Sequence, residues 1–99
     1  METPLGIEQL EKVAFILKTV AHPLRLGVVD LLTYHERLSV NEICEKLHAE
    51  QSLVSHHLNN MKLKRILGSS REGKNVYYFL KMKEVVKVIA CMESCDTTF

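Results

Sequence analysis

Short hydrogen-bonding side chains recur along one segment in the second half of the chain. Within 51–64, Val54, Leu58 and Met61 stand at i, i+4 and i+7, which predicts a helix with one buried face. The residues of its opposite face are Gln51, Ser52, Ser55, His56, Asn59 and Lys62. Serine and glutamine can bond to base edges, and serine and histidine can bind phosphate. This face therefore suits the DNA major groove, which admits one helix.

Two basic side chains lie in a segment of different periodicity that follows this helix. Residues 66–71 and 76–80 are rich in β-branched and aromatic residues, as strands are. Between them Glu72-Gly73-Lys74-Asn75 predicts a hairpin turn in which glycine can adopt a positive φ. Arg71 and Lys74 then lie near the hairpin tip, where they could contact the phosphate backbone or a minor groove.

The cysteines are the other chemically reactive groups. Cys91 and Cys95 are four residues apart in a predicted helix over 82–96, so their Cβ atoms lie about 6 Å apart. A disulfide needs about 3.5–4.5 Å, whereas one soft metal ion or arsenite could bridge two thiolates more easily. This pair is a possible thiol sensor of metalloid, metal or oxidant. Alternatively Cys95 packs in an interface and Cys91 is a small buried hydrophobe, as Cys44 is expected to be.

The elements that must position these groups follow from apolar spacing and from turn residues. We expect five helices. The first spans about 5–20, the second begins at Pro23, and the others span about 40–47, about 51–64 and 82–96. The two strands come before the last helix. Thr3-Pro4 is the expected start of the first helix, and 33–38 is expected to be a polar loop. Ser39 and Glu42 form a capping box. The fold class is mainly α with a small β-hairpin, a winged helix-turn-helix of order α-α-α-α-β-β-α.

The segment 82–96 is apolar on more of its circumference than one small domain needs. Its two stripes are Val85, Val88, Met92 and Cys95, at heptad spacing, and beside them Met82, Val86 and Ile89. We expect it to pack against another subunit.

Length and composition limit the remaining choices. The chain has 99 residues, 46% of them apolar and 25% charged, which predicts one globular domain over 1–99. Residues 1–50 hold five basic and eight acidic groups, and residues 51–99 hold eight basic and four acidic, so one basic face is expected. The sequence has neither an apolar run near ~18 residues nor a leader pattern, which favours a cytoplasmic protein without membrane contact.

Four motifs in the chain resemble the ArsR/SmtB family of winged-helix repressors. They are Ala-His-Pro-Leu-Arg-Leu at 21–26, Leu-Ser-Val-Asn-Glu-Ile at 38–43, Gln-Ser-Leu-Val-Ser-His-His-Leu at 51–58 and Arg-Glu-Gly-Lys-Asn-Val-Tyr-Tyr at 71–78. The resemblance covers about 10–95. It implies a homodimer built on the segments at about 5–20 and 82–96, an inverted repeat in double-stranded DNA, and repression relieved by an inducer. It also implies that Gln51, Ser52, Ser55 and His56 face the groove while Arg71 and Lys74 act from the wing.

The sequence departs from the family at its metal sites. Ser39 and Asn41 stand where the thiolate site has its two cysteines. The positions of the other family site, a zinc site in the last helix, are Met82, Glu84, Cys95 and Thr98, of which only Glu84 and Cys95 could ligate. We therefore expect no metal at the standard family sites, and no certain cofactor beyond a possible metalloid or metal at Cys91 and Cys95. His48 stands where the family usually has glycine.

Three other functions are alternatives to a metalloid- or metal-responsive repressor. The first is a metal-independent regulator whose cysteines are structural. The second is a winged helix used as a protein-interaction module, for which an exposed apolar patch would be expected near the polar face at 51–64. The third, an enzyme using Cys91 or His56, lacks a partner triad in the sequence, so no enzyme is expected.

Overall fold

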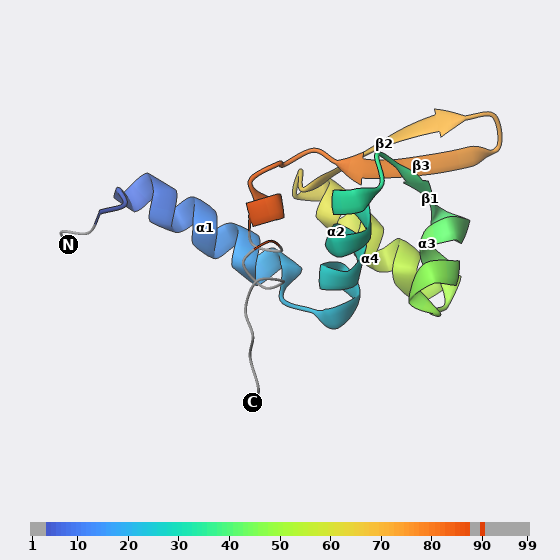
Figure 1. The fold of residues 1–99 in the computed structure, drawn as a ribbon, viewed down its shortest axis with the longest axis horizontal. Helices are drawn as coiled ribbons and strands as arrows, with labels where there is room; N and C mark the ends of the chain where they lie inside the picture. The colour runs from blue at the N-terminus through green and yellow to red at the C-terminus, as the bar shows by residue number, and fades with distance from the viewer. Residues whose placement is uncertain (1–3, 88–89, 91–99) are drawn as a thin grey trace.

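The computed structural model describes residues 4–87 and 90. Its elements are, in order, α1 (Ile7–Val20), α2 (Pro23–Tyr34), β1 (Leu38–Ser39), α3 (Val40–Leu47), α4 (Gln51–Leu63), β2 (Leu67–Glu72) and β3 (Asn75–Leu80). Helices α2, α3 and α4 lie together, and the hairpin of β2 and β3 extends along one side of them as the wing (Figure 1). The winged helix-turn-helix prediction is confirmed, and the boundaries predicted for α1, α3 and α4 agree with the structure within two residues. The last predicted helix, expected from Met82, begins at Val85.

The sheet contains one strand that the sequence did not predict. Its order is β1-β3-β2 and its pairing is antiparallel, with Leu38 opposite Tyr78 and Ser39 opposite Tyr77. The expected loop at 33–38 was wrong at both ends, because α2 continues to Tyr34 and Leu38 begins β1. A two-residue strand has no periodicity of its own, and it exists because the edge of β3 offers backbone partners.

The turn and cap residues act largely as their types predict. The Ser39 hydroxyl accepts a hydrogen bond from the Glu42 amide at 3.1 Å, and the Glu42 carboxylate accepts one from the Ser39 amide at 2.9 Å. His48 ends α3 in the left-handed region, at φ 51°, where glycine is usual. The expected start of the first helix at Thr3-Pro4 was wrong, since Gly6 is the N-cap of α1.

The core fixes α4 through the face that the sequence predicted. Val54, Leu58 and Met61 are each at most 1% exposed, and they pack in one cluster with Ile43 of α3 and Ile66 beyond α4. This burial leaves the opposite face of α4 to solvent.

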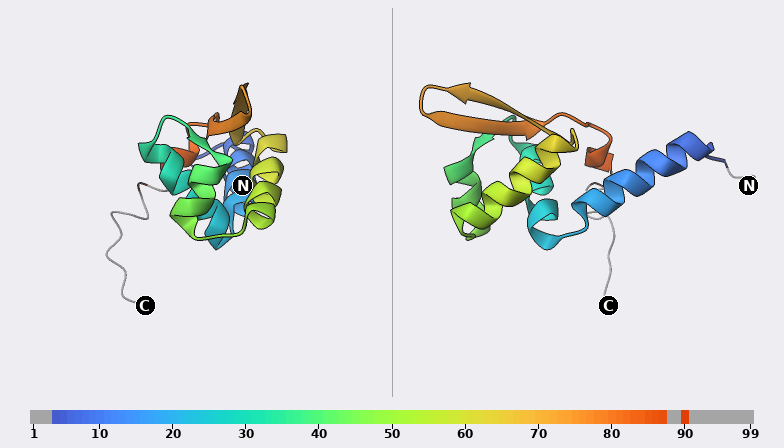
Figure 2. Two further views of the ribbon diagram at one scale, coloured as in Figure 1. Left: turned by 90° about the vertical axis from the view of Figure 1, so that its right-hand side faces the viewer. Right: turned by 180° about the vertical axis from the view of Figure 1, so that it is seen from behind.

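Helix α1 buries only part of its apolar surface. Ile16 and Val20 join the core, whereas Val13, Phe15 and Leu17 are 42–48% exposed. The helix projects from the body of the fold, as two opposite views show (Figures 1 and 2). Val13 and Leu17 lie on one side of the helix, and Phe15 lies on the other.

The structure describes only the beginning of the helix predicted over 82–96. Residues 85–87 and 90 are helical, Val85 is fully buried, and Met82 and Val86 pack against the core. The remaining seam residues, including Val88 and Met92, lie outside the described part of the chain. No helix among residues 4–87 and 90 is long and apolar enough to cross a membrane.

We predict that Gly68→Ala destabilises the base of the wing. A Cβ atom at Gly68 would lie 2.5 Å from Cζ and 2.6 Å from Cε2 of Phe79, its cross-strand partner. The ring must move, so we expect unfolding free energy to fall by about 1–3 kcal/mol in a urea titration. Gly6→Ser is the control, because a Cβ there meets nothing within 4 Å. An unchanged urea midpoint for Gly68→Ala would contradict the prediction.

Candidate nucleic-acid interface

The outward face of α4 carries the predicted hydrogen-bonding residues. Five of the six are exposed and Ser55 is half-buried; the six are Gln51, Ser52, Ser55, His56, Asn59 and Lys62. The Ser52 hydroxyl donates to the Glu50 carboxylate at 3.0 Å, which holds this anionic group at the start of the helix. The remaining donors and acceptors of the face are available to a ligand of groove shape.

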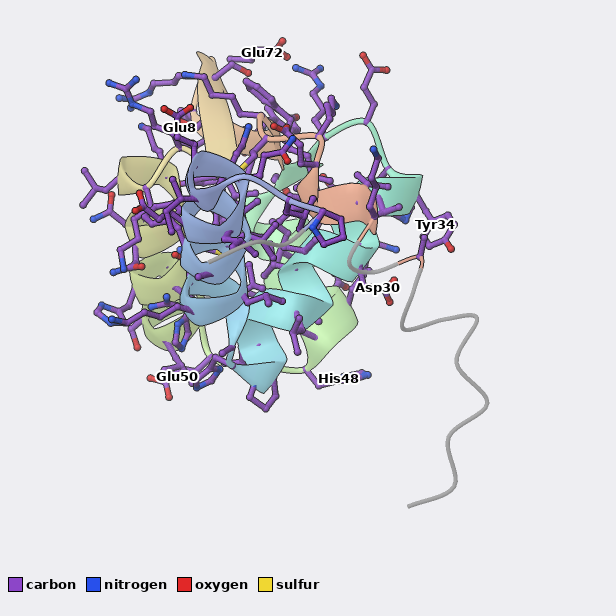
Figure 3. All side chains as sticks on the ribbon, turned by 90° about the vertical axis from the view of Figure 1, so that its left-hand side faces the viewer. Glu8, Asp30, Tyr34, His48, Glu50 and Glu72 are labelled. Atoms are coloured by element: carbon purple, nitrogen blue, oxygen red, sulfur yellow. The ribbon has the colours of Figure 1, made fainter. Side chains whose placement is uncertain are left out.

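The wing presents its two predicted cations at its tip. The turn at Gly73 has φ +62°, as expected, and the flanking pairs are Arg71 with Val76 and Glu72 with Asn75. Arg71 and Lys74 are both exposed. In Figure 3, Glu72 lies at one edge of the molecule and His48 and Glu50, from the turn between α3 and α4, lie at the opposite edge.

A further basic residue, Arg37, supports the wing. Its guanidinium donates to the Glu72 carboxylate, and its Cζ atom lies 4.3 Å from the centre of the Tyr77 ring. The hydrogen bond from Arg37 lowers the pKa of Glu72. Glu72 is therefore held as an ion-paired carboxylate beside Arg71, which weakens its repulsion of a phosphate. Sequence reasoning missed this pair, because 35 positions separate its members.

Two hollows join α4 to the wing. The first lies at the N-terminal end of α4, and its lining includes Gln51, Asn41 and Lys74. The second lies at the C-terminal end, and its lining includes Lys62, Arg65 and Lys81. The structure thus brings predicted residues of the helix and the wing onto one surface. Arg65 and Lys81 are cations of this surface that sequence reasoning counted in the charge excess and did not place.

The positions of the family's metal sites carry other contacts here. The Ser39 side chain is occupied in the capping box, and Asn41 is exposed. Glu84 forms an ion pair with Lys12 of α1, and the hydrogen bond from Lys12 lowers the Glu84 pKa. Residues 4–87 and 90 hold no group of three histidine, cysteine or acidic side chains that could hold a metal ion.

The predicted thiol pair cannot be placed in this arrangement. Cys91 and Cys95 lie outside the described residues, as does Thr98. Cys44 is half-buried on α3, packs against the core as predicted, and burial raises the pKa of its thiol.

Comparison with known proteins agrees with the fold and identifies the family. Residues 22–67 match the family described as bacterial regulatory protein, arsR family. The transcriptional repressor PagR of Bacillus anthracis is 41% identical over 80 residues, which cover 81% of this chain and 80% of PagR. The chain belongs to the ArsR family. It is accordingly a DNA-binding transcriptional regulator and not an enzyme.

Solved structures of transcriptional regulators superpose on most of this chain. The crystal structure of PagR matches with a TM-score of 0.77 and 38% identity, covering 88% of this chain and 99% of that one. The structure of the transcriptional regulator HlyU from Vibrio vulnificus matches with a TM-score of 0.80 and 32% identity, covering 91% and 93%. The matched region includes α4 and the wing, so the polar and basic surface stands on a framework shared with these regulators.

Proposed function

We propose that this chain is a transcriptional repressor that binds an inverted-repeat operator in double-stranded DNA as a homodimer. The observation that carries the proposal is the continuity of the hydrogen-bonding face of α4 with the basic wing. A helix face of this kind reads base edges, and cations on both sides of it bind the phosphate backbone. The similarity to PagR, named as a repressor, supports the direction of regulation.

In this proposal the residues of the surface have two different roles. Ser55 and His56, in the middle of the outward face of α4, contact bases or nearby phosphates in the major groove. Lys74 and Arg71 contact the backbone from the wing tip, and Lys62 does so from the end of α4. Loss of a base contact should depend on the sequence of the DNA, and loss of a phosphate contact should not.

The homodimer is proposed from the apolar side of α1. Val13 and Leu17, four residues apart and therefore on one face, are exposed on a helix that projects from the body of the fold. Burying such a surface against a second copy would add stability that a chain of this length needs. It would also hold two α4 helices at a fixed separation, as an inverted repeat requires.

We expect Ser55→Ala and His56→Ala to weaken binding to the preferred operator by about 1–3 kcal/mol, because each removes a groove contact. Lys74→Ala should weaken binding to all sequences alike and reduce the salt slope by about one unit. The measurement is fluorescence anisotropy with a duplex selected by the protein from a random pool. Lys18→Ala, an exposed cation of α1, is the control. Unchanged affinity in all three variants would reject this surface.

Leu17→Glu should yield monomers in sedimentation velocity and abolish operator binding. Leu17 is 48% exposed, so the chain can still fold, but a glutamate there would be unpaired in the proposed interface. Leu53→Glu is a matched control for assembly alone, since Leu53 is 46% exposed and lies on α4; it should remain dimeric in sedimentation velocity. A Leu17→Glu variant that remains dimeric would place the interface elsewhere.

We propose, as a mode of regulation, that a thiol-reactive inducer acts at Cys91 and Cys95. A ligand bridging the two thiolates would distort the helix predicted over 82–96, and coupling of about 1–3 kcal/mol to operator affinity is enough for a switch. In a reporter strain, arsenite, soft metals or peroxide should relieve repression by the natural protein and not by the Cys91→Ser/Cys95→Ser variant. Equal responses, or none from either protein, would favour structural cysteines.

A further inference from the structure

One histidine of α4 faces inward and is held by a charged group. The His57 side chain is buried, with the residue 6% exposed, and its Nδ1 atom accepts a hydrogen bond from Nε of Arg25 at 2.9 Å. The same guanidinium donates from Nη1 to the carbonyl oxygen of Thr19, also at 2.9 Å. Arg25 of α2 therefore links the last turn of α1 to the inner side of the DNA-reading helix.

The corner between α1 and α2 is ordered around this link. Thr19 is 3% exposed, and its hydroxyl donates to the carbonyl of Phe15. His22 caps α2 by accepting a hydrogen bond from the Leu24 amide at Nδ1, and its ring centre lies 4.3 Å from that of His57. The neighbouring His56, by contrast, points outward on the proposed DNA-reading face, with its ring centre 5.4 Å from that of His57.

The Arg25 contact requires one protonation state of His57. A guanidinium has donors and no acceptor, so Nδ1 must present a lone pair, and the proton of neutral His57 must lie on Nε2. A second proton would place N–H against N–H and put two cations in contact. Burial, first, and then His22, Arg25 and His56 lower the pKa of His57. At neutral pH the contact is therefore intact.

We propose that the Arg25–His57 hydrogen bond positions α4 for DNA reading, and that protonation of His57 in mild acid breaks this bond and weakens operator binding. Arg25 and His57 are positioning residues, since neither lies on the outward face of α4. The proposal rests on the proposed function, because its effect is read through DNA. If the proposal is right, the DNA affinity of the outward face of α4 depends on the Arg25–His57 contact at the inward face of the same helix.

The direction of the pH effect follows from linkage. The native state disfavours protonated His57, so its pKa lies below the ordinary histidine value near 6.5. Above that value both native and unfolded states are neutral, and the contact contributes fully. As the pH falls below about 6.5 the unfolded state, or any state with α4 released from Arg25, binds the proton more readily, and the contribution is lost.

The test compares natural protein with His57→Asn between about pH 7.5 and about pH 5.5, a range that brackets the ordinary histidine pKa. Asparagine places an acceptor oxygen near the Nδ1 position and does not titrate. We expect the natural protein to lose about tenfold more operator affinity across this range than His57→Asn, the fold-change of one charge-assisted hydrogen bond. Both proteins carry His56, so its direct contribution to DNA binding is common to the two. His35→Asn, at an exposed histidine, should keep the natural pH profile.

Two further measurements distinguish a role in positioning α4 from a role in the stability of the fold. Arg25→Lys keeps the charge but cannot make both hydrogen bonds, so it should bind DNA more weakly at both pH values while remaining folded by circular dichroism. Nuclear magnetic resonance of the histidine side chains should show His57 as the Nε2–H tautomer at neutral pH.

Identical pH profiles for the natural protein and His57→Asn, or an Nδ1–H tautomer of His57, would overturn the inference. Absence of selective DNA binding at every pH would instead overturn the proposed function. Even if the protein does not bind DNA selectively, the tautomer of His57 seen by nuclear magnetic resonance would still test the Arg25–His57 hydrogen bond.

Discussion

Helix α4 has to be held firmly on one side while the other side stays free, and the rest of the structure serves that constraint. Its inner face buries Val54, Leu58 and Met61 almost completely, which removes apolar surface from water and fixes the rotation of the helix. The wing lies along α4, with hollows between the two at both ends of the helix, and α3 lies against α4 in the same core cluster. Because burial fixes the rotation of the helix, the residues of the opposite face, among them Gln51, His56 and Asn59, are exposed to solvent.

Much of the fold could be predicted from the sequence because its signals are local. The period of α4, the capping box of Ser39 and Glu42, and the glycine turn of the wing each depend on residues within one or two turns of chain. Strand β1 could not be predicted in this way. Its two residues pair with Tyr77 and Tyr78 nearly forty positions away, and no local pattern reports such a partner.

The residues of the candidate surface also differ in whether local sequence signals predict them. Its helical and hairpin-tip residues could be named from spacing, since a face of a helix and the tip of a turn are local properties. Arg37, Arg65 and Lys81 could not be assigned, because their roles come from neighbours brought near by the fold. His57 is the clearest case. Two adjacent histidines look alike in the sequence, yet the period of the helix points His56 outward and His57 toward Arg25.

Helices α1 and α4 are linked through Arg25 of α2, and both contribute residues to the same core. Ile16 and Val20 of α1 belong to the core cluster that also holds the inner face of α4, but apolar packing tolerates small rotations. The Arg25 guanidinium restricts the relative orientation of these helices, because its two donors must reach the Thr19 carbonyl and His57 Nδ1 at once. A displacement of the last turn of α1 would therefore reach the inner side of α4 through one rigid planar group. In the proposed dimer α1 lies at the interface, so the same group would connect the geometry of assembly to the geometry of DNA reading.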